Sequence, residues 1–407
     1  MISEKNHIVD QIRQLINDLR RDGRGWILLT VSAGWFLSLG VRVIYPAIVP
    51  FLRSEFGISL TMAGFLLTVL WGAYALGQFP GGVLGDRYGE GNMLVVSTVI
   101  SGIAILLVAL SFSIEMLFLA SIVFGFSTAL FGPIRFTIFT DVYTDRTSTA
   151  VGITMSSGNI GNSVLPVIAV TLAGLSTWRL GFGLTAPAFF AVGLALYLTV
   201  PARTSGASAL IDDLSGRAFK QILRGIRQRD IIVLTVVQIF LGFTYQGFVG
   251  FFPTYLIEIK GLSPPVAATV FGIFFASAII VQPLTGYFQD VIGPKIVLGS
   301  AIGLFAISLL ALPFVFGAFL LAGLTVGLSS RTGTGVVINT YIAGALPSNM
   351  KGTGLGLLRM TWILIGTTAP VAIGALGDRG LLEEGFMLLA GFAIVALVMV
   401  YFVPLPE

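Results

Sequence analysis

Residues 82–89 read Gly-Val-Leu-Gly-Asp-Arg-Tyr-Gly, and residues 286–293 read Gly-Tyr-Phe-Gln-Asp-Val-Ile-Gly. The first glycine, the aspartate and the last glycine of the two stretches agree at an offset of 204 residues (286 minus 82). Four more positions agree at the same offset without a gap: Gly57 with Gly261, Ser59 with Ser263, Gln78 with Gln282, and Gly152 with Gly356. This constant spacing indicates that the chain is built from two homologous halves.

The composition places the chain in a membrane. Apolar residues make up 56% of the 407 residues, charged residues make up 10%, and the mean hydropathy is +0.96. A soluble protein of this length would have to expose large apolar patches and would aggregate. The 50 glycines and 32 phenylalanines fit helices in lipid, where small residues allow close approach and bulky ones face the acyl chains.

Twelve stretches are long and apolar enough to cross a bilayer, which takes about 20 residues each. They are residues 26–51, 61–84, 93–112, 116–140, 148–174, 180–201, 231–256, 265–288, 295–315, 318–343, 353–376 and 384–404. The sequence therefore predicts an all-α integral membrane protein, with twelve transmembrane helices in two pseudo-symmetric six-helix bundles. We expect an N-terminal segment, a first bundle, a linker and a second bundle at residues 1–25, 26–201, 202–230 and 231–407.

The basic residues indicate how the chain is oriented. If it crosses twelve times, 15 lysines and arginines lie on the side of the termini and the linker. The other side receives Arg53, Arg179, Lys260 and Arg379. Positive charge marks the cytoplasmic side, so we expect a multi-pass protein of the cytoplasmic (inner) membrane with both termini in the cytoplasm. The N-terminal segment fits either an amphipathic surface helix or a solvated tail.

The repeated stretch after the second span resembles the signature loop of the major facilitator superfamily, and the resemblance extends over nearly the whole chain. It implies the major facilitator fold, with transport by alternating access. The family's loop holds the cytoplasmic side closed in one conformation. This role would fall here to Gly82, Asp86, Arg87, Gly89 and, in the second copy, Asp290. Asp86 would accept hydrogen bonds at the N-terminus of a neighbouring helix, where the dipole favours an anion.

One departure from the family pattern follows this loop. The basic residue that usually comes after the last glycine is replaced by Glu90-Gly91-Asn92. We therefore expect a weaker latch than is typical of the family.

Four arginines lie inside apolar stretches: Arg42 in the first span, Arg135 in the fourth, Arg331 in the tenth and Arg359 in the eleventh. Ionisable groups within a membrane are costly and usually functional. All 19 acidic residues fall in tails, loops or span ends. A cavity lined by positive charge alone favours an anion as cargo, since the guanidinium fork matches carboxylate and phosphate geometry.

Arg42 and Arg331 lie near the middle of their spans, one in each half, and we expect them to bind the substrate. Arg135 and Arg359 lie nearer the cytoplasmic ends and are candidates for either gating or substrate contact.

The surroundings of Arg42 resemble the organic-anion branches of the superfamily, especially the anion:cation symporter group. The resemblance rests on residues 42–50 and 72–82, and it implies that Tyr74 and Gln78 join Arg42 around a carboxylated substrate. These two residues are one helical turn apart and share a face. Further polar residues either complete the site or bond neighbouring helices: Tyr245, Gln246, Gln282 and Asn339.

The sequence thus favours a secondary active or facilitative transporter of a small organic anion, with the carboxylates as leading candidates and inorganic oxyanions still open. The alternative is a proton antiporter of the same fold that expels lipophilic drugs, which predicts a carboxylate in the cavity. We expect no enzymatic activity, cofactor, metal site or nucleic-acid partner, since the chain has no cysteine and its one histidine is in the tail. The expected partners are the bilayer, the anion, and a coupling ion (H⁺ or Na⁺) or counter-anion, with the protein a monomer.

Overall fold

The computed structural model describes residue 19 and residues 23–204, 228–345 and 351–403. The first half contains α2 (Arg24–Phe56), α3 (Leu60–Tyr88), α4 (Glu90–Ala109), α5 (Ile114–Val142), α6 (Thr147–Leu175), α7 (Trp178–Gly183) and α8 (Thr185–Thr199). The second half contains α10 (Arg229–Glu258), α11 (Pro264–Ile292), α12 (Pro294–Ala311), η2 (Leu312–Phe314), α13 (Ala318–Leu328), α14 (Arg331–Ala345), α15 (Lys351–Gly366), α16 (Ala369–Gly377) and α17 (Leu382–Tyr401).

These helices form twelve membrane spans, as the hydropathy predicts. Eleven spans within the described residues are long and apolar enough to cross a membrane. The twelfth span is made of α13 and α14, which are too short separately because the helix breaks at Ser329-Ser330. Most of the expected segment 1–25 and most of the linker 202–230 lie outside the described residues.

The structure interrupts three spans that the sequence analysis treats as continuous. Besides the break at Ser329-Ser330, α7 passes into α8 at Leu184, and α15 ends before Thr367. The last break has a local cause, because Pro370 at the start of α16 has no N–H to continue the hydrogen-bond ladder. Discontinuous helices in membranes persist where neighbouring groups satisfy the freed backbone.

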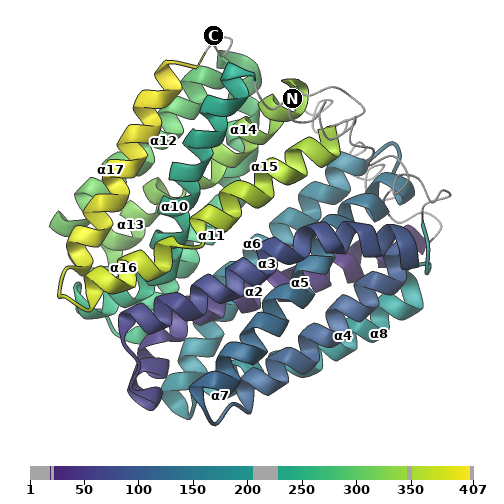
Figure 1. The fold of residues 1–407 in the computed structure, drawn as a ribbon, viewed down its shortest axis with the longest axis horizontal. Coiled ribbons are helices and arrows are strands. Elements are labelled where there is room, and N and C mark those ends of the chain that lie inside the picture. The colour runs from purple at the N-terminus through teal and green to yellow at the C-terminus, as the bar shows by residue number, and fades with distance from the viewer. Residues whose placement is uncertain (1–18, 20–22, 205–227, 346–350, 404–407) are drawn as a thin grey trace, which may run out of the picture.

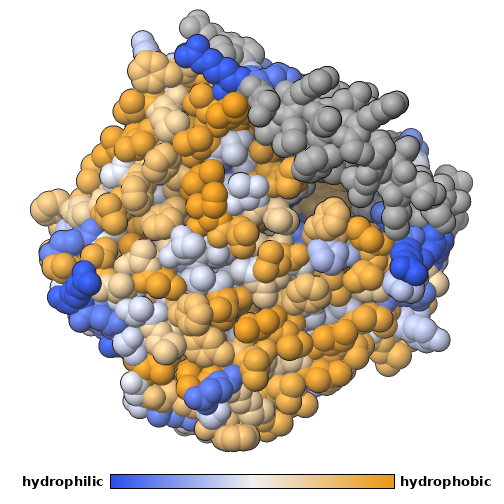
Figure 2. Space-filling view, in the orientation of Figure 1, coloured by the Kyte–Doolittle hydropathy of each residue, from blue (hydrophilic) through white to orange (hydrophobic). Residues whose placement is uncertain are grey.

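The two halves lie side by side, and each has its helices running between the same two ends of the molecule (Figure 1). We call the end where α2 begins and α17 ends the terminal end, and the end where α2 passes into α3 the distal end. Hydrophilic residues gather toward these ends, while hydrophobic residues cover the flank between them (Figure 2). This belt is the surface expected to face lipid.

The halves meet tightly at the distal end through backbone contacts. A Cβ atom added to Gly64 of α3 would lie 2.3 Å from the Pro370 carbonyl oxygen. In return, a Cβ atom on Gly374 of α16 would lie 2.3 Å from the Leu60 carbonyl oxygen. Thr68 adds a hydrogen bond of 2.6 Å across the same contact, from its hydroxyl to the carbonyl of Thr367. Only glycine permits helices to approach this closely.

Charged groups reinforce this contact between the halves. The Asp378 carboxylate accepts hydrogen bonds from the backbone N–H groups of Leu60 (2.7 Å) and Thr61 (2.9 Å) and from the Thr61 hydroxyl. Partial burial favours the neutral acid, but the hydrogen bonds from Thr61 and Leu60 outweigh it and hold the pKa of Asp378 below its usual range. Arg53 of α2 also forms an ion pair with Glu258 of α10. The distal end is therefore closed between the halves.

At the terminal end, several hydrogen bonds between described residues lie within one half. The hydroxyl of Thr204 bonds Asp141 at 2.9 Å, and Arg203 donates to the Arg87 carbonyl at 2.9 Å, both within the first half. In the second half, the Tyr341 hydroxyl bonds Asp230 at 3.0 Å. The hydrogen bonds, the ion pair and the close glycine contacts given above between the halves are thus at the distal end.

Candidate functional site

Arg42 lies in the middle of α2 and is completely buried. Its Nε donates to the Ser38 carbonyl at 2.9 Å, one turn back on the same helix. Both terminal nitrogens, Nη1 and Nη2, are buried and have no hydrogen-bond partner. A buried guanidinium with two unused donors carries a large desolvation cost, which an anion placed beside it would offset.

Aromatic rings surround this guanidinium. Its central carbon lies 3.7 Å from the ring centre of Tyr74, 4.9 Å from that of Trp71 and 5.9 Å from that of Trp35. The guanidinium interacts electrostatically with Tyr74 but stacks over the ring, where its terminal nitrogens have no hydrogen bond of acceptable geometry. Ring faces attract cations, and they hold Arg42 in place while leaving its edge donors unused.

Arg135 of α5 lies on the same tryptophan. Its central guanidinium carbon is 3.4 Å from the ring centre of Trp35 and 4.2 Å from that of Phe136. Nη1 donates to the Gly132 carbonyl at 2.8 Å, while Nη2 has only the sulfur of Met155, at 3.5 Å. The structure thus brings together Arg42 and Arg135, which the sequence analysis assigns to different depths.

Arg331 is the first residue of α14, directly after the break in its span. Its Nε donates to the Leu241 carbonyl at 3.1 Å, and Nη1 donates to the Thr334 hydroxyl at 2.7 Å. Its central carbon lies 5.5 Å from the ring of Tyr245, which also interacts electrostatically with Arg42. Tyr245 therefore connects the two expected arginines across the halves, although Arg331 has more of its donors satisfied by the protein.

Arg359 of α15 is exposed. It interacts electrostatically with Tyr74 and with Arg135 of the first half. The charge of Arg359 is therefore on the side of α15 that faces the first half, near Arg135.

The amide side chains take different positions. Gln78 donates to the Ala129 carbonyl at 3.1 Å and packs on Gly132, so its amide holds α3 against α5. Gln282 accepts a long hydrogen bond of 3.5 Å from Asn159, which joins α11 to α6 across the halves. Gln246 is buried beside Tyr245. The Oδ1 atom of Asn339 is buried without a partner.

The expected latch residues lie at the terminal end. Asp86, Arg87 and Asp290 are all exposed. Gly89 has a φ of +94°, which disfavours other residues, and a Cβ there would lie 2.3 Å from the Ala202 carbonyl oxygen. Gly82 has open space around it.

The fold accommodates Glu90, which stands close to where the family usually has a basic residue. Glu90 is buried, and it accepts a hydrogen bond of 2.9 Å from the backbone N–H of Thr204. Its carboxylate therefore fixes the chain that leaves α8.

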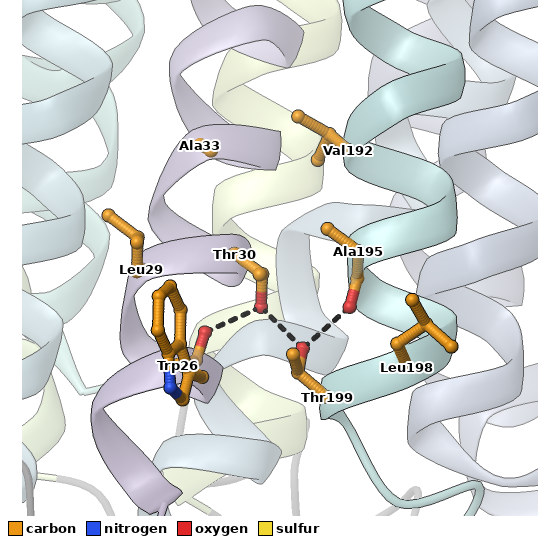
Figure 3. Close-up of a pocket in the computed structure, with 8 residues that line it drawn as sticks. All are labelled: Trp26, Leu29, Thr30, Ala33, Val192, Ala195, Leu198 and Thr199. Atoms are coloured by element: carbon orange, nitrogen blue, oxygen red, sulfur yellow. Dashed lines mark hydrogen bonds between the residues drawn. The ribbon is translucent and has the colours of Figure 1, made fainter.

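One groove in the structure lies away from these residues (Figure 3). It runs between α2 and α8 near the terminal end, and its lining is almost entirely apolar, from Trp26 and Leu29 to Val192 and Leu198. Its threonines are already paired, since Thr30 and Thr199 bond each other at 3.0 Å and each also bonds its own helix. An apolar groove of this kind suits an acyl chain and offers nothing to an anion.

The tryptophans that organise the site are not among the residues predicted from the sequence. Trp35 lies two helical turns before Arg42 on α2, and Trp71 lies one turn before Tyr74 on α3. Their spacing places each on the same helical face as its polar neighbour, and this periodicity could have identified them. Within the described residues, no group of three histidines, aspartates or glutamates is arranged to hold a metal.

Known proteins match the chain over most of its length. A family model described as Major Facilitator Superfamily matches residues 30–269 and 234–407. A cis,cis-muconate transport protein of Acinetobacter baylyi is 25% identical over 83% of this chain and 84% of its own length. A hexuronate transporter of Bacillus subtilis is 24% identical over 85% of this chain and 86% of its own length. The solved structure of a D-xylose–proton symporter aligns with a TM-score of 0.76 at 17% identity, covering 94% of this chain and 98% of that one.

Proposed function

The chain belongs to the major facilitator superfamily of secondary transporters, and from this premise we propose that it carries a small organic anion, a carboxylate, across the cytoplasmic membrane. The anion binds between the halves at Arg42, with Tyr74 and Tyr245 beside it. The halves then rock about this site and expose it alternately to each side.

The unpaired donors of Arg42 carry this proposal. Nη1 and Nη2 are the two terminal nitrogens of a fully buried guanidinium, and neither has an acceptor in the protein. A carboxylate can accept from Arg donors in pairs, and such charge-assisted bonds are stronger than neutral ones. Arg331 lies next to Tyr245 and adds positive charge to the site. Its Nε bonds the Leu241 carbonyl of α10, and its Nη1 bonds Thr334 within α14.

The relatives support a carboxylate in particular. The muconate and hexuronate transporters are named for carboxylated substrates, and each matches over more than four fifths of its own length. In the described chain, the carboxylates lie at helix ends or in turns, so the deep arginines face a cargo and one another.

The arrangement of the halves fits one state of the transport cycle. Gly64, Gly374 and Asp378 close the distal end, while the latch residues Asp86 and Asp290 are exposed at the terminal end. With the termini in the cytoplasm, as the basic residues indicate, this is an inward-facing state. In it the cytoplasmic latch is released, and cargo exchanges with the cytoplasm.

The test is ligand-induced stabilisation of the purified protein, followed by uptake into proteoliposomes. A ligand at 100 times its Kd raises the stability by about 2.7 kcal/mol, which a thermal shift resolves. We expect stabilisation by one class of carboxylates, and loss of both stabilisation and uptake in Arg42→Gln. The matched control is Arg379→Gln, which removes an exposed arginine at the distal end.

Two results would contradict the proposal. Arg42→Gln could retain carboxylate uptake at the level of the Arg379→Gln control. Alternatively, lipophilic cations alone could stabilise the protein, which would identify a drug exporter.

A further inference from the structure

Trp35 is a rigid platform between two of the buried arginines. Its indole is 3% exposed and stacks on Phe131, with 6.3 Å between ring centres and 21° between planes. On the α6 side, a Cβ on Gly158 would lie 2.5 Å from the indole nitrogen, so the backbone of α6 presses against it. The ring therefore has little freedom to move, and it fixes the positions of the cations that stack on it.

Two guanidinium groups share this platform. The central carbons of Arg135 and Arg42 lie 3.4 Å and 5.9 Å from the same ring centre. Arg135 and Arg42 also repel each other electrostatically, and Arg359 adds to this repulsion. Such a cluster of like charges in a buried site is unfavourable until counter-charge arrives. One carboxylate compensates one arginine and leaves the other without a counter-charge.

Arg135 has donor capacity to offer. Its Nη2 contacts the thioether of Met155 at 3.5 Å, and a thioether sulfur is a weak acceptor. An anionic oxygen would replace this contact with a much stronger one. Arg135 is 4% exposed, so water compensates it little in the present arrangement.

We propose that Arg42 and Arg135 form two anion subsites beside Trp35, and that the cargo is a dianion with one carboxylate for each. This inference rests on the proposed function of Arg42. Within it, Arg42 anchors any organic anion, while Arg135 distinguishes two charges from one. Arg359 interacts electrostatically with Arg135 and so adds positive potential at the second subsite.

The test compares pairs of anions that differ by one carboxylate. The probes are cis,cis-muconate against sorbate, succinate against butyrate, and terephthalate against benzoate. Binding to the full-length protein is measured by calorimetry at pH 7, where the carboxylates of all six probes are ionised. For at least one pair, we expect the dianion to bind about tenfold or more tightly, the order expected for one additional charge-assisted bond.

Variants assign the preference to Arg135. In Arg135→Gln, we expect the dianion to lose much more affinity than the monoanion, so that the ratio for that pair falls to about one. Arg135→Lys should restore part of the ratio, because it keeps the charge but not the planar stacking on Trp35. Arg42→Gln should lose both members of the pair. The melting temperature without ligand shows whether each variant is folded.

The outcomes separate this inference from the proposed function. Equal affinities for dianion and monoanion in the unaltered protein would overturn the dianion inference and leave the role of Arg42 intact, and this result needs no variant. An equal loss of both probes in Arg135→Gln would show a purely structural arginine. Failure of all six anions to bind would overturn the inference together with its premise.

Discussion

Replacing Gly64 by alanine should open the distal end. The new Cβ would lie 2.3 Å from the carbonyl oxygen of Pro370 and 2.6 Å from its carbonyl carbon. Both atoms belong to the backbone of α16, so no side-chain rotation can relieve the overlap. Ordinary contacts of a Cβ begin near 3.4 Å, and the two halves would therefore have to separate locally by about 1 Å.

The magnitude follows from the cost of overpacking. Forcing a methyl group into a tightly packed contact costs about 1–3 kcal/mol. Here the cost falls only on the arrangement in which the distal end is closed, because the contact joins α3 of one half to α16 of the other. The equilibrium between distal-closed and distal-open arrangements should therefore shift toward the open one by about 5- to 150-fold.

Distances across the distal end measure this shift. The chain has no cysteine, so spin labels can be attached at introduced cysteines without a background. Phe112 in the first half and Phe319 in the second are 82% and 90% exposed at this end, which suits them as label sites. Pulsed electron–electron double resonance measures the distance between the two labels. In Gly64→Ala, we expect a larger share of the molecules to show a longer distance.

The matched control is Gly72→Ala on the same helix, where a Cβ would meet nothing within 4 Å. We expect its distance distribution to equal that of the parent protein. An unchanged distribution in Gly64→Ala would refute the claim that the contact of Gly64 with Pro370 keeps the distal end closed. An equal change in both variants would refute it too.

Three other predictions use the same protein. Asp378→Asn weakens the hydrogen bonds to the start of α3 and should raise the distal-open fraction by severalfold, read with the same labels. Because the pKa of Asp378 is held below its ordinary value of 3.8, its contribution is complete above that value and is lost as the pH falls through the lowered pKa. We measure this contribution as the difference in distal-closed fraction between the parent protein and Asp378→Asn. The difference should not change from pH 8 to pH 5. A transition near pH 6 in that difference would contradict the role of Asp378. Gly161→Ala places a Cβ 2.3 Å from the Phe36 carbonyl oxygen inside the first half and should lower the melting temperature by several degrees, whereas Gly152→Ala on the same helix has open space and should not.

The sequence was sufficient to predict the twelve spans because spanning length and hydropathy are local properties. The breaks in the helices are less local. Pro370 signals the break before α16, but α13 ends at Ser329-Ser330, where Ser330 bonds the Ala301 carbonyl at 2.9 Å on another helix. No pattern within the span itself contains that partner.

In the candidate site, too, some features are local in the sequence and others depend on distant residues. Hydropathy and charge identify Arg42 and Arg331 as deep arginines, and they give the two residues equal standing. The structure distinguishes them through partners from distant parts of the chain, since Leu241 and Thr334 satisfy Arg331 while the ends of Arg42 have none. Which face of each helix turns toward its neighbour depends on packing over the whole bundle, and the role of Trp35 depends on that rotation.

The glycine contact at the distal end is reciprocal, and this has a genetic consequence. Gly64 rests on Pro370 and Gly374 rests on Leu60, four residues away on each helix, and every opposing atom within 2.6 Å belongs to the main chain. Shrinking a neighbouring side chain therefore cannot make room for a substitution at Gly64 or Gly374. In a selection for restored transport, suppressors of Gly64→Ala should map away from α16. We expect them to be substitutions that make the opposite, terminal-closed arrangement less favourable and so rebalance the cycle.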